Sequence, residues 1–196
     1  MTAATGHMRE GAGRPEAVAA IRLLVLDVDG VMTDGLIYYS AEGETLKAFS
    51  AQDGMAIKHG RALGLECAVV SGRQSAPLER RLADLGITAV HLSVDNKLEA
   101  VRMLARERGL TAAEVAMMGD DLIDYGAMCW AGLALAPADA AADIRDLADH
   151  VTPRGGGRGA VRDAVEYILA AQGRRLIEAL DEAQLGTVHM SGGTEP

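Results

Sequence analysis

Short apolar runs alternate with amphipathic stretches along most of the chain. The run from Ile21 to Leu26 is almost continuously apolar and ends at Asp27, which is typical of a strand buried on both faces. Most of the amphipathic stretches end at a glycine, the usual C-terminal stop of a helix. The pattern predicts further strands at 65–70, 88–92, 114–118, 133–136 and 149–152, and helices at 53–63, 75–85, 95–108, 121–130, 139–147 and 160–171.

The remaining segments flank or interrupt this alternation. Residues 15–20 open on a proline and predict a short helix. Residues 36–50 hold two β-prone runs separated by Ala-Glu-Gly-Glu, and they predict a β-hairpin. We expect a disordered tail at 1–14, a single domain over 15–172, and a C-terminal tail at 173–196 that begins in a helix-like way.

Strands that alternate with helices indicate an α/β fold with a doubly wound, mostly parallel, Rossmann-like sheet. No inserted segment is long enough to form a cap domain, so we expect only the hairpin to project from the core. Ligands of such sheets bind beyond the carboxyl ends of the strands. The strand ends offer Asp27, Ser71-Gly72-Arg73 and Gly119-Asp120 as candidates.

Composition and charge limit the partners. Hydrophobic residues make up 49% of the 196 positions, and the net charge is −9. Nucleic acids and anionic membranes need basic patches, so neither is an expected partner. No apolar stretch approaches the about 18 residues of a membrane span. The first residues lack a basic region followed by an apolar one, so we expect no secretory signal. Cys67 and Cys129 are expected to be free thiols of a cytoplasmic protein.

Asp27 and Asp29 leave the first predicted strand within one loop. Two such carboxylates are costly unless they are paired or bound to a metal, although a solvated turn or a plain metal loop also fits the pair. Ser71, Lys97 and the segment 119–124 (Gly-Asp-Asp-Leu-Ile-Asp) add a hydroxyl, a cation and further carboxylates at element boundaries. Magnesium prefers oxygen ligands, and phosphoryl transfer requires positioning and charge neutralisation. The set therefore indicates phosphoryl transfer, with a carboxylate as a possible nucleophile.

The Asp-x-Asp-Gly-x-x-Thr signature, followed in order by Ser71, Lys97 and Gly-Asp-Asp-x-x-Asp, resembles the haloacid dehalogenase superfamily. The resemblance implies that Asp27 attacks phosphorus to form an aspartyl-phosphate, while Asp29 serves as acid and then as base. It also implies that the Asp27 side chain, the Asp29 backbone carbonyl and Asp120 hold Mg²⁺, and that Ser71 and Lys97 bind the phosphate. A metal on the Asp29 carbonyl leaves the Asp29 carboxyl free for proton transfer.

Further segments resemble a capless branch of this superfamily that dephosphorylates an eight-carbon sugar acid for lipopolysaccharide precursor synthesis. They are Gly35–Tyr38, Glu44–Phe49, Asn96-Lys97 and Gly156–Arg162, and the similarity covers about residues 20–172. The resemblance implies a sugar-acid phosphate as substrate and a homotetramer in which a neighbouring subunit completes the active site. The implied substrate-binding residues are Asp29, Ser50, Gln52, Asp53, Gly54, Lys58, Arg73, Arg81 and Lys97, supported by Asp121 and Asp124.

Several of these residues have structural alternatives. Arg73 also fits a helix cap or a surface ion pair, and Arg81 also fits a solvated helix face. Asp121 and Asp124 also fit helix-start charges, which the helix dipole favours. The Gly-rich segment 155–159 is a further candidate for phosphate binding.

Two departures keep alternatives open. Gln52 and Lys58 stand where this branch often has arginine, and both weaken bidentate recognition of a carboxylate. A nine-carbon sugar-acid phosphate is therefore the alternative substrate. A phosphoacceptor receiver module is disfavoured because Asp27 and Asp29 share one loop and Lys97 precedes the last aspartate. A catalytically inactive interaction protein is disfavoured because every expected catalytic residue type is present.

Overall fold

The computed structural model describes residues 14–180. Of the predicted N-terminal tail only Arg14, the N-cap of the first helix, lies within this range, and the C-terminal tail beyond residue 180 lies outside it. The strands are β1 (Leu23–Leu26), β2 (Tyr38–Ser40), β3 (Gly43–Leu46), β4 (Glu66–Val70), β5 (Val90–His91), β6 (Val115–Met118), β7 (Leu133–Ala136) and β8 (His150–Val151). The helices are α1 (Pro15–Ala19), α2 (Ala51–Ala62), α3 (Ala76–Leu85), α4 (Lys97–Glu107), α5 (Tyr125–Trp130), α6 (Ala142–Leu147) and α7 (Ala160–Ala171), with 3₁₀ turns η1 (Ala112–Glu114), η2 (Leu122–Asp124) and η3 (Leu176–Ala179).

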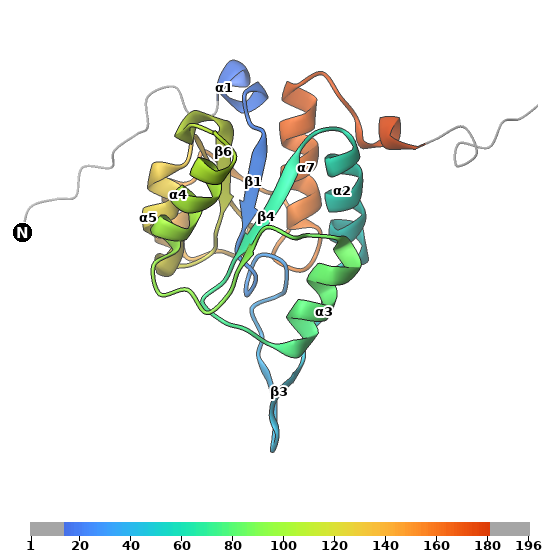
Figure 1. Ribbon diagram of the computed structural model, residues 1–196, viewed down its shortest axis with the longest axis vertical. Helices are drawn as coiled ribbons and strands as arrows, with labels where there is room; N and C mark the ends of the chain where they lie inside the picture. The colour runs from blue at the N-terminus through green and yellow to red at the C-terminus, as the bar shows by residue number, and fades with distance from the viewer. Residues whose placement is uncertain (1–13, 181–196) are drawn as a thin grey trace, which may run out of the picture.

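Six strands form one parallel sheet in the order β5-β4-β1-β6-β7-β8. Every residue of β1, β6 and β7 is buried, as expected for central strands covered on both faces. Figure 1 shows α2, α3 and α7 on one side of the sheet and α4 and α5 on the other. The predicted α/β fold with a doubly wound parallel sheet is therefore confirmed.

Each face of the sheet has its own apolar core. Leu24 and Leu26 of β1 point into the core shared with α2, α3 and α7, whereas Leu23 and Val25 point into the core shared with α4, α5 and α6. Alternate residues of a strand face opposite sides, so one short strand anchors both cores. Burying each such side chain contributes roughly 1.5–3 kcal/mol. The start of the loop that begins at Asp27 is consequently held on a rigid support.

The antiparallel pair β2–β3 forms the predicted hairpin and projects beyond the carboxyl ends of the sheet strands, away from α1 (Figure 1). The part of the chain that the structure describes contains no cap domain over these strand ends. Between residues 14 and 180, no helix is both long and apolar enough to cross a membrane.

Several element boundaries differ from the prediction, most clearly at the starts of three helices. Helix α2 begins at Ala51 rather than at 53, because the Ser50 hydroxyl accepts the backbone N–H of Asp53 and caps the helix. The helix predicted at 121–130 opens as the 3₁₀ turn η2, in which Asp121 caps the turn. The helix predicted from 139 begins only at Ala142.

Candidate active site

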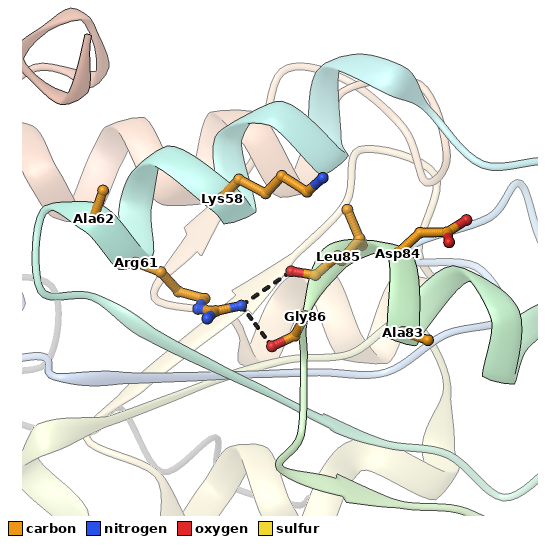
Figure 2. A pocket seen from close by; sticks show the side chains of 7 residues that line it. All are labelled: Lys58, Arg61, Ala62, Ala83, Asp84, Leu85 and Gly86. Atoms are coloured by element: carbon orange, nitrogen blue, oxygen red, sulfur yellow. Dashed lines mark hydrogen bonds between the residues drawn. The ribbon is translucent and has the colours of Figure 1, made fainter. Parts of the chain in front are cut away.

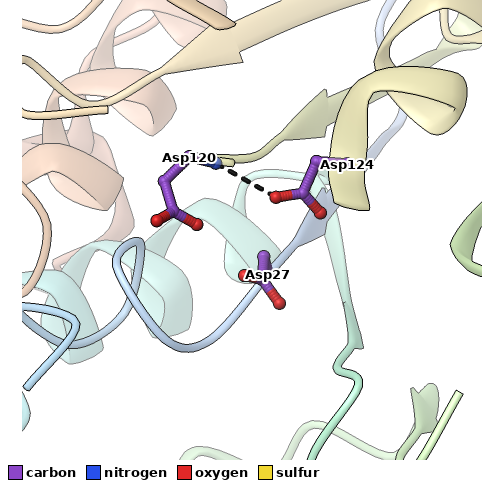
Figure 3. Close-up of side chains that lie close together, drawn as sticks. All are labelled: Asp27, Asp120 and Asp124. Atoms are coloured by element: carbon purple, nitrogen blue, oxygen red, sulfur yellow. Dashed lines mark hydrogen bonds between the residues drawn. The ribbon is translucent and has the colours of Figure 1, made fainter. Parts of the chain in front are cut away.

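Three carboxylates meet at the carboxyl ends of β1 and β6. Oxygen atoms of Asp27, Asp120 and Asp124 lie within 4.8 Å of one another. Figure 3 shows the three side chains pointing toward one another, Asp27 from the segment after β1 and Asp120 and Asp124 from the segment after β6. Asp27 and Asp124 are buried and Asp120 is partly buried. Gly30 allows this arrangement, because a Cβ there would lie 2.0 Å from Asp120 Oδ2. Gly30 also has a φ of +93°, which favours glycine.

Lys97 bridges two of the three carboxylates. Its Nζ lies 2.7 Å from Asp27 Oδ1 and 2.7 Å from Asp124 Oδ1, and only 3% of the residue is exposed. Lys97 opens α4, whose N-cap Asn96 accepts the N–H of Glu99. The other oxygen of Asp124 accepts the backbone N–H groups of Asp120 and Asp121 at 3.1 and 3.4 Å. Asp124 therefore orients both Lys97 and the Asp120 loop.

The three carboxylates carry more negative charge than Lys97 can offset. Burial and the neighbouring charge of Asp124 raise the pKa of Asp27 to about 6, against the opposing effect of Lys97. Burial and the charges of Asp27 and Asp124 raise the pKa of Asp120 to about 8. Burial disfavours the Lys97 ammonium, but Asp27 and Asp124 outweigh burial and raise the pKa of Lys97. An all-oxygen donor set with surplus negative charge fits a divalent cation such as Mg²⁺.

Asp29 lies outside this carboxylate cluster and faces the hairpin. Its Oδ1 accepts from the ammonium of Lys47, and its Oδ2 lies 3.7 Å from Arg73 Nε. Glu44 joins the two cations, because its oxygens lie 2.7 Å from Lys47 Nζ and 2.7 Å from Arg73 Nη2. Lys47 is absent from the predicted site residues. Lys47 belongs to the segment Glu44–Phe49 that carries the family resemblance, but its i,i+3 spacing from Glu44 also fits an ordinary surface pair, so the sequence did not indicate its contact with Asp29.

Ser71 directly follows β4, the neighbour of β1 in the sheet, as Asp27 directly follows β1. The residue is buried, and its hydroxyl accepts the backbone N–H of Arg73 at 3.2 Å. Asp121 is exposed and accepts the N–H of Leu122 at 2.7 Å. The structure thus brings Asp27, Ser71 and the Asp120–Asp124 loop to one edge of the sheet.

The predicted substrate segment 50–54 forms the start of α2, and its side chains face other parts of the protein. The carboxylate of Asp53 accepts the backbone N–H groups of Gly159 and Arg162 at 3.3 and 2.8 Å. Gln52 accepts from Arg154 at 2.8 Å. Asp53 therefore caps α7, although Gly159 occupies the N-cap position of that helix.

Arg81 reaches the same segment from α3. Its Nη2 donates to the Ser50 carbonyl at 3.0 Å, and its guanidinium carbon lies 5.8 Å from the centre of the Phe49 ring. Gly54 makes room for it, since a Cβ there would lie 2.3 Å from Arg81 Nη2. In this structure Arg81 joins α3 to the start of α2.

Lys58 lies further along α2. It lines a shallow cavity of about 540 Å³ between α2 and the end of α3, where Arg61 donates to the carbonyls of Leu85 and Gly86 (Figure 2). None of the residues lining this cavity belongs to the carboxylate cluster. This surface cavity is therefore separate from the candidate chemistry.

The Gly-rich segment 155–159 packs against the loop after β1, which carries Asp27 and Asp29. Gly157 donates its N–H to the Val31 carbonyl at 3.0 Å, and a Cβ at Gly156 would lie 1.9 Å from the Gly30 carbonyl oxygen. Gly156 donates to Asp139 at 2.9 Å, and the N–H of Gly159 is taken by Asp53. These N–H groups already have protein partners, which disfavours a phosphate cradle at this segment.

Known proteins match both the sequence and the fold. A family model described as haloacid dehalogenase-like hydrolase matches residues 90–162. The 3-deoxy-D-manno-octulosonate 8-phosphate phosphatase of Escherichia coli K12 is 45% identical over 164 residues, which cover 84% of this chain and 85% of that protein. The enzyme of the same name from Haemophilus influenzae is 41% identical over 84% of this chain and 90% of that protein.

Solved structures of enzymes with the same name resemble this protein in fold. A 3-deoxy-D-manno-octulosonate 8-phosphate phosphatase from Moraxella catarrhalis, in complex with a magnesium ion, a phosphate ion and a KDO molecule, superposes with a TM-score of 0.78 at 36% identity, covering 81% of this chain and 91% of that one. The Yersinia pestis enzyme gives a TM-score of 0.80 at 42% identity, covering 83% and 88%.

Fold and site thus define a haloacid dehalogenase-like hydrolase that cleaves phosphoric monoesters. Within that class, the chain belongs to the 3-deoxy-D-manno-octulosonate 8-phosphate phosphatase family. This bears out the family resemblance and the enzyme class expected from the sequence.

Proposed function

We propose that this protein hydrolyses 3-deoxy-D-manno-octulosonate 8-phosphate to KDO and phosphate, with Mg²⁺ as cofactor. The observation that carries the proposal is the buried cluster of Asp27, Asp120 and Asp124 bridged by Lys97. Family membership at 45% identity supports the substrate, as does the relative that binds magnesium, phosphate and KDO together.

Asp27 and Asp120 would hold the cation through their carboxylates, together with the Asp29 backbone carbonyl. The bound ion would neutralise the phosphoryl oxygens and so permit attack by an anionic nucleophile. Asp124 already binds Lys97 and two backbone N–H groups, so its proposed role is to hold Lys97 and Asp120 in position. Ser71 and Lys97 remain the proposed phosphate-binding groups.

The reaction proceeds in two steps. The Asp27 carboxylate attacks phosphorus and forms an aspartyl-phosphate, while the bond to the sugar oxygen breaks and Asp29 gives that oxygen a proton. Asp29 then takes a proton from water, whose oxygen attacks phosphorus and releases phosphate, and Asp27 is restored. Lys97 fixes Asp27 for the attack through its 2.7 Å ion pair.

Arg73 is the proposed contact for the carboxylate of the sugar acid. The side chain of Arg73 is 39% exposed beside Asp29, so its guanidinium can meet an incoming carboxylate. The other proposed substrate residues are Ser50, Gln52, Asp53, Gly54, Lys58 and Arg81. Most of their side chains contact other parts of this chain, so they could bind substrate only by giving up these internal contacts.

We also infer that the protein assembles as a homotetramer in which a neighbouring subunit completes the active site. Five large apolar side chains of the hairpin region are exposed: Leu36, Ile37, Tyr38, Tyr39 and Leu46. Contiguous exposed apolar patches mark interaction sites. A partner would also shield the strand ends from water, since the described residues provide no cap. A cytoplasmic location is supported by the two free thiols, Cys67 and Cys129.

The test is phosphate release by purified protein from the eight-carbon and nine-carbon sugar-acid phosphates. We expect preference for the eight-carbon substrate, loss of activity with a chelator and recovery with Mg²⁺. Asp27→Asn should lower turnover by about 10⁴-fold or more, and Asp29→Asn by about 10²–10⁴-fold. A clear preference for the nine-carbon phosphate would refute the substrate, and full activity of Asp27→Asn would refute the mechanism.

A further inference from the structure

The hairpin places the buried side chain of Lys47 against Asp29, the proposed acid/base residue. Lys47 follows β3, and its side chain is only 1% exposed although the neighbouring Leu46 is 57% exposed. Its ammonium contacts both Asp29 and Glu44. Burial disfavours this ammonium, but Asp29 and Glu44 outweigh burial and raise the pKa of Lys47. A lysine is rarely buried in this way unless its charge is paired.

Lys47, Glu44, Arg73 and Asp29 form a closed network of two cations and two anions. Three different segments supply them: the loop after β1, the hairpin and the loop after β4. Lys47 holds Asp29 Oδ1, while Arg73 Nε approaches Asp29 Oδ2 at 3.7 Å. Glu44 holds both cations at 2.7 Å and so fixes their spacing. The carboxyl group of Asp29 is thereby restrained from two sides.

We propose that Lys47 is a positioning residue, which aims the Asp29 carboxyl at the leaving oxygen during cleavage. The inference rests on the proposed role of Asp29 as acid and base. Lys47 acts through Asp29 and itself transfers no proton: the proton passes from Asp29 to the leaving oxygen as the phosphorus–oxygen bond breaks. Small errors in the placement of a catalytic group cost up to about 10²-fold in rate.

This role predicts an effect that depends on the leaving group. A poor leaving group needs the proton as it departs, whereas a good leaving group departs without it. Loss of positioning at Asp29 therefore slows cleavage of poor leaving groups most. A merely structural role for Lys47 would slow every substrate by the same factor.

The experiment compares Lys47→Met with wild type on aryl phosphates of similar size, from p-nitrophenyl phosphate to phenyl phosphate, with saturating Mg²⁺. These substrates carry no sugar acid, so lost carboxylate recognition does not interfere. We expect kcat/KM to fall about 10²-fold for phenyl phosphate, and by less than about 3-fold for p-nitrophenyl phosphate. Arg80→Met is the matched control, because it removes a cation from an ion pair with Asp84 in which Arg80 is 82% exposed.

An equal loss of kcat/KM across the aryl series, or no loss, would overturn the inference. If circular dichroism shows that Lys47→Met does not fold, Lys47→Gln is measured instead. The loss of kcat/KM should again be larger for phenyl phosphate than for p-nitrophenyl phosphate, because the amide is uncharged. Wild-type hydrolysis of the sugar-acid phosphate is measured in parallel. Its failure would refute the proposed substrate while leaving the aryl series to decide the role of Lys47.

Discussion

At the scale of single residues, the protein concentrates negative charge where it needs a cation. Asp27, Asp120 and Asp124 lie close together, and Lys97 contacts two of them. Burial is the larger cause of the raised pKa values of Asp27 and Asp120, and repulsion between the carboxylates raises both further. Such an arrangement is unfavourable for the metal-free fold. It becomes favourable when a divalent ion binds. The same three carboxylates therefore lower the stability of the metal-free protein and raise its affinity for the cation.

This exchange predicts how stability depends on pH. A carboxyl whose pKa is higher in the folded than in the unfolded protein binds more protons when folded, so stability falls as pH rises between the two values. For Asp120 this window runs from the ordinary aspartate pKa of 3.8 to a pKa of about 8. In chelator, Asp120→Asn should therefore raise the melting temperature over wild type, by a margin that grows from pH 5 to pH 8. Differential scanning calorimetry measures this margin.

Magnesium provides the control for that experiment. Metal binding requires deprotonated carboxylates, so Mg²⁺ should stabilise the wild-type protein increasingly as pH rises. Asp120→Asn should gain much less stability from the ion. A margin in chelator that shrinks as pH rises would contradict the raised pKa of Asp120.

The sequence predicted some of these residues and missed others for a physical reason. Asp27, Ser71 and Asp120 follow parallel strands, and the carboxyl ends of parallel strands meet at one edge, so their convergence was predictable. Lys47 was not, because its contact with Asp29 depends on how the hairpin leaves the core. A Glu-x-x-Lys spacing looks the same on an exposed strand as over an active site.

At the scale of elements, loops distant in sequence hold one another by backbone contacts. Gly156 and Gly157 lie directly against the Gly30–Thr33 loop, at distances that leave no space for a Cβ. Asp53 of α2 in turn binds the first N–H groups of α7. The loop after β1 is thus supported by the segment that leads into α7, and the start of α7 is itself held by α2.

Asp53 offers a direct test of this support. Asp53→Ala removes the cap and leaves one buried and one partly buried N–H group without this partner, so we expect a loss of about 1–3 kcal/mol in the free energy of unfolding. Urea denaturation measures this loss, and Asp143→Ala, an exposed aspartate in the first turn of α6, is the control. If Asp53 instead binds substrate, as the sequence suggests, KM should rise with little change in stability.

Element boundaries show the same limit of sequence reasoning. The start of α2 at Ala51 follows from the Ser50 cap, a local signal that was available. The capping of α7 by Asp53 joins residues 106 positions apart, and no local pattern reports it. Strands β5 and β8 shrink to two residues each because both lie at the edges of the sheet, where pairing is one-sided.

At the scale of the whole molecule, the alternation of buried strands and amphipathic helices was enough to predict the parallel sheet and its two helical layers. The hairpin was predictable as an element, but the direction in which it projects was not. That direction places its apolar side chains outside the core and its buried Lys47 at the active site. The proposed assembly and the proposed positioning of Asp29 would therefore depend on the same structural element.

This sharing leads to a last prediction, that disrupting assembly lowers activity without touching a catalytic group. Leu36 and Leu46 are 58% and 57% exposed on the hairpin region, and the double variant Leu36→Glu, Leu46→Glu places two charges in the proposed interface. Light scattering should give wild type at about four times the 20.5 kDa chain mass and the variant at a lower mass with reduced kcat/KM. Met103→Glu on α4, where Met103 is 40% exposed, should leave both unchanged. A monomeric and fully active wild type would show instead that the strand ends are shielded without a partner.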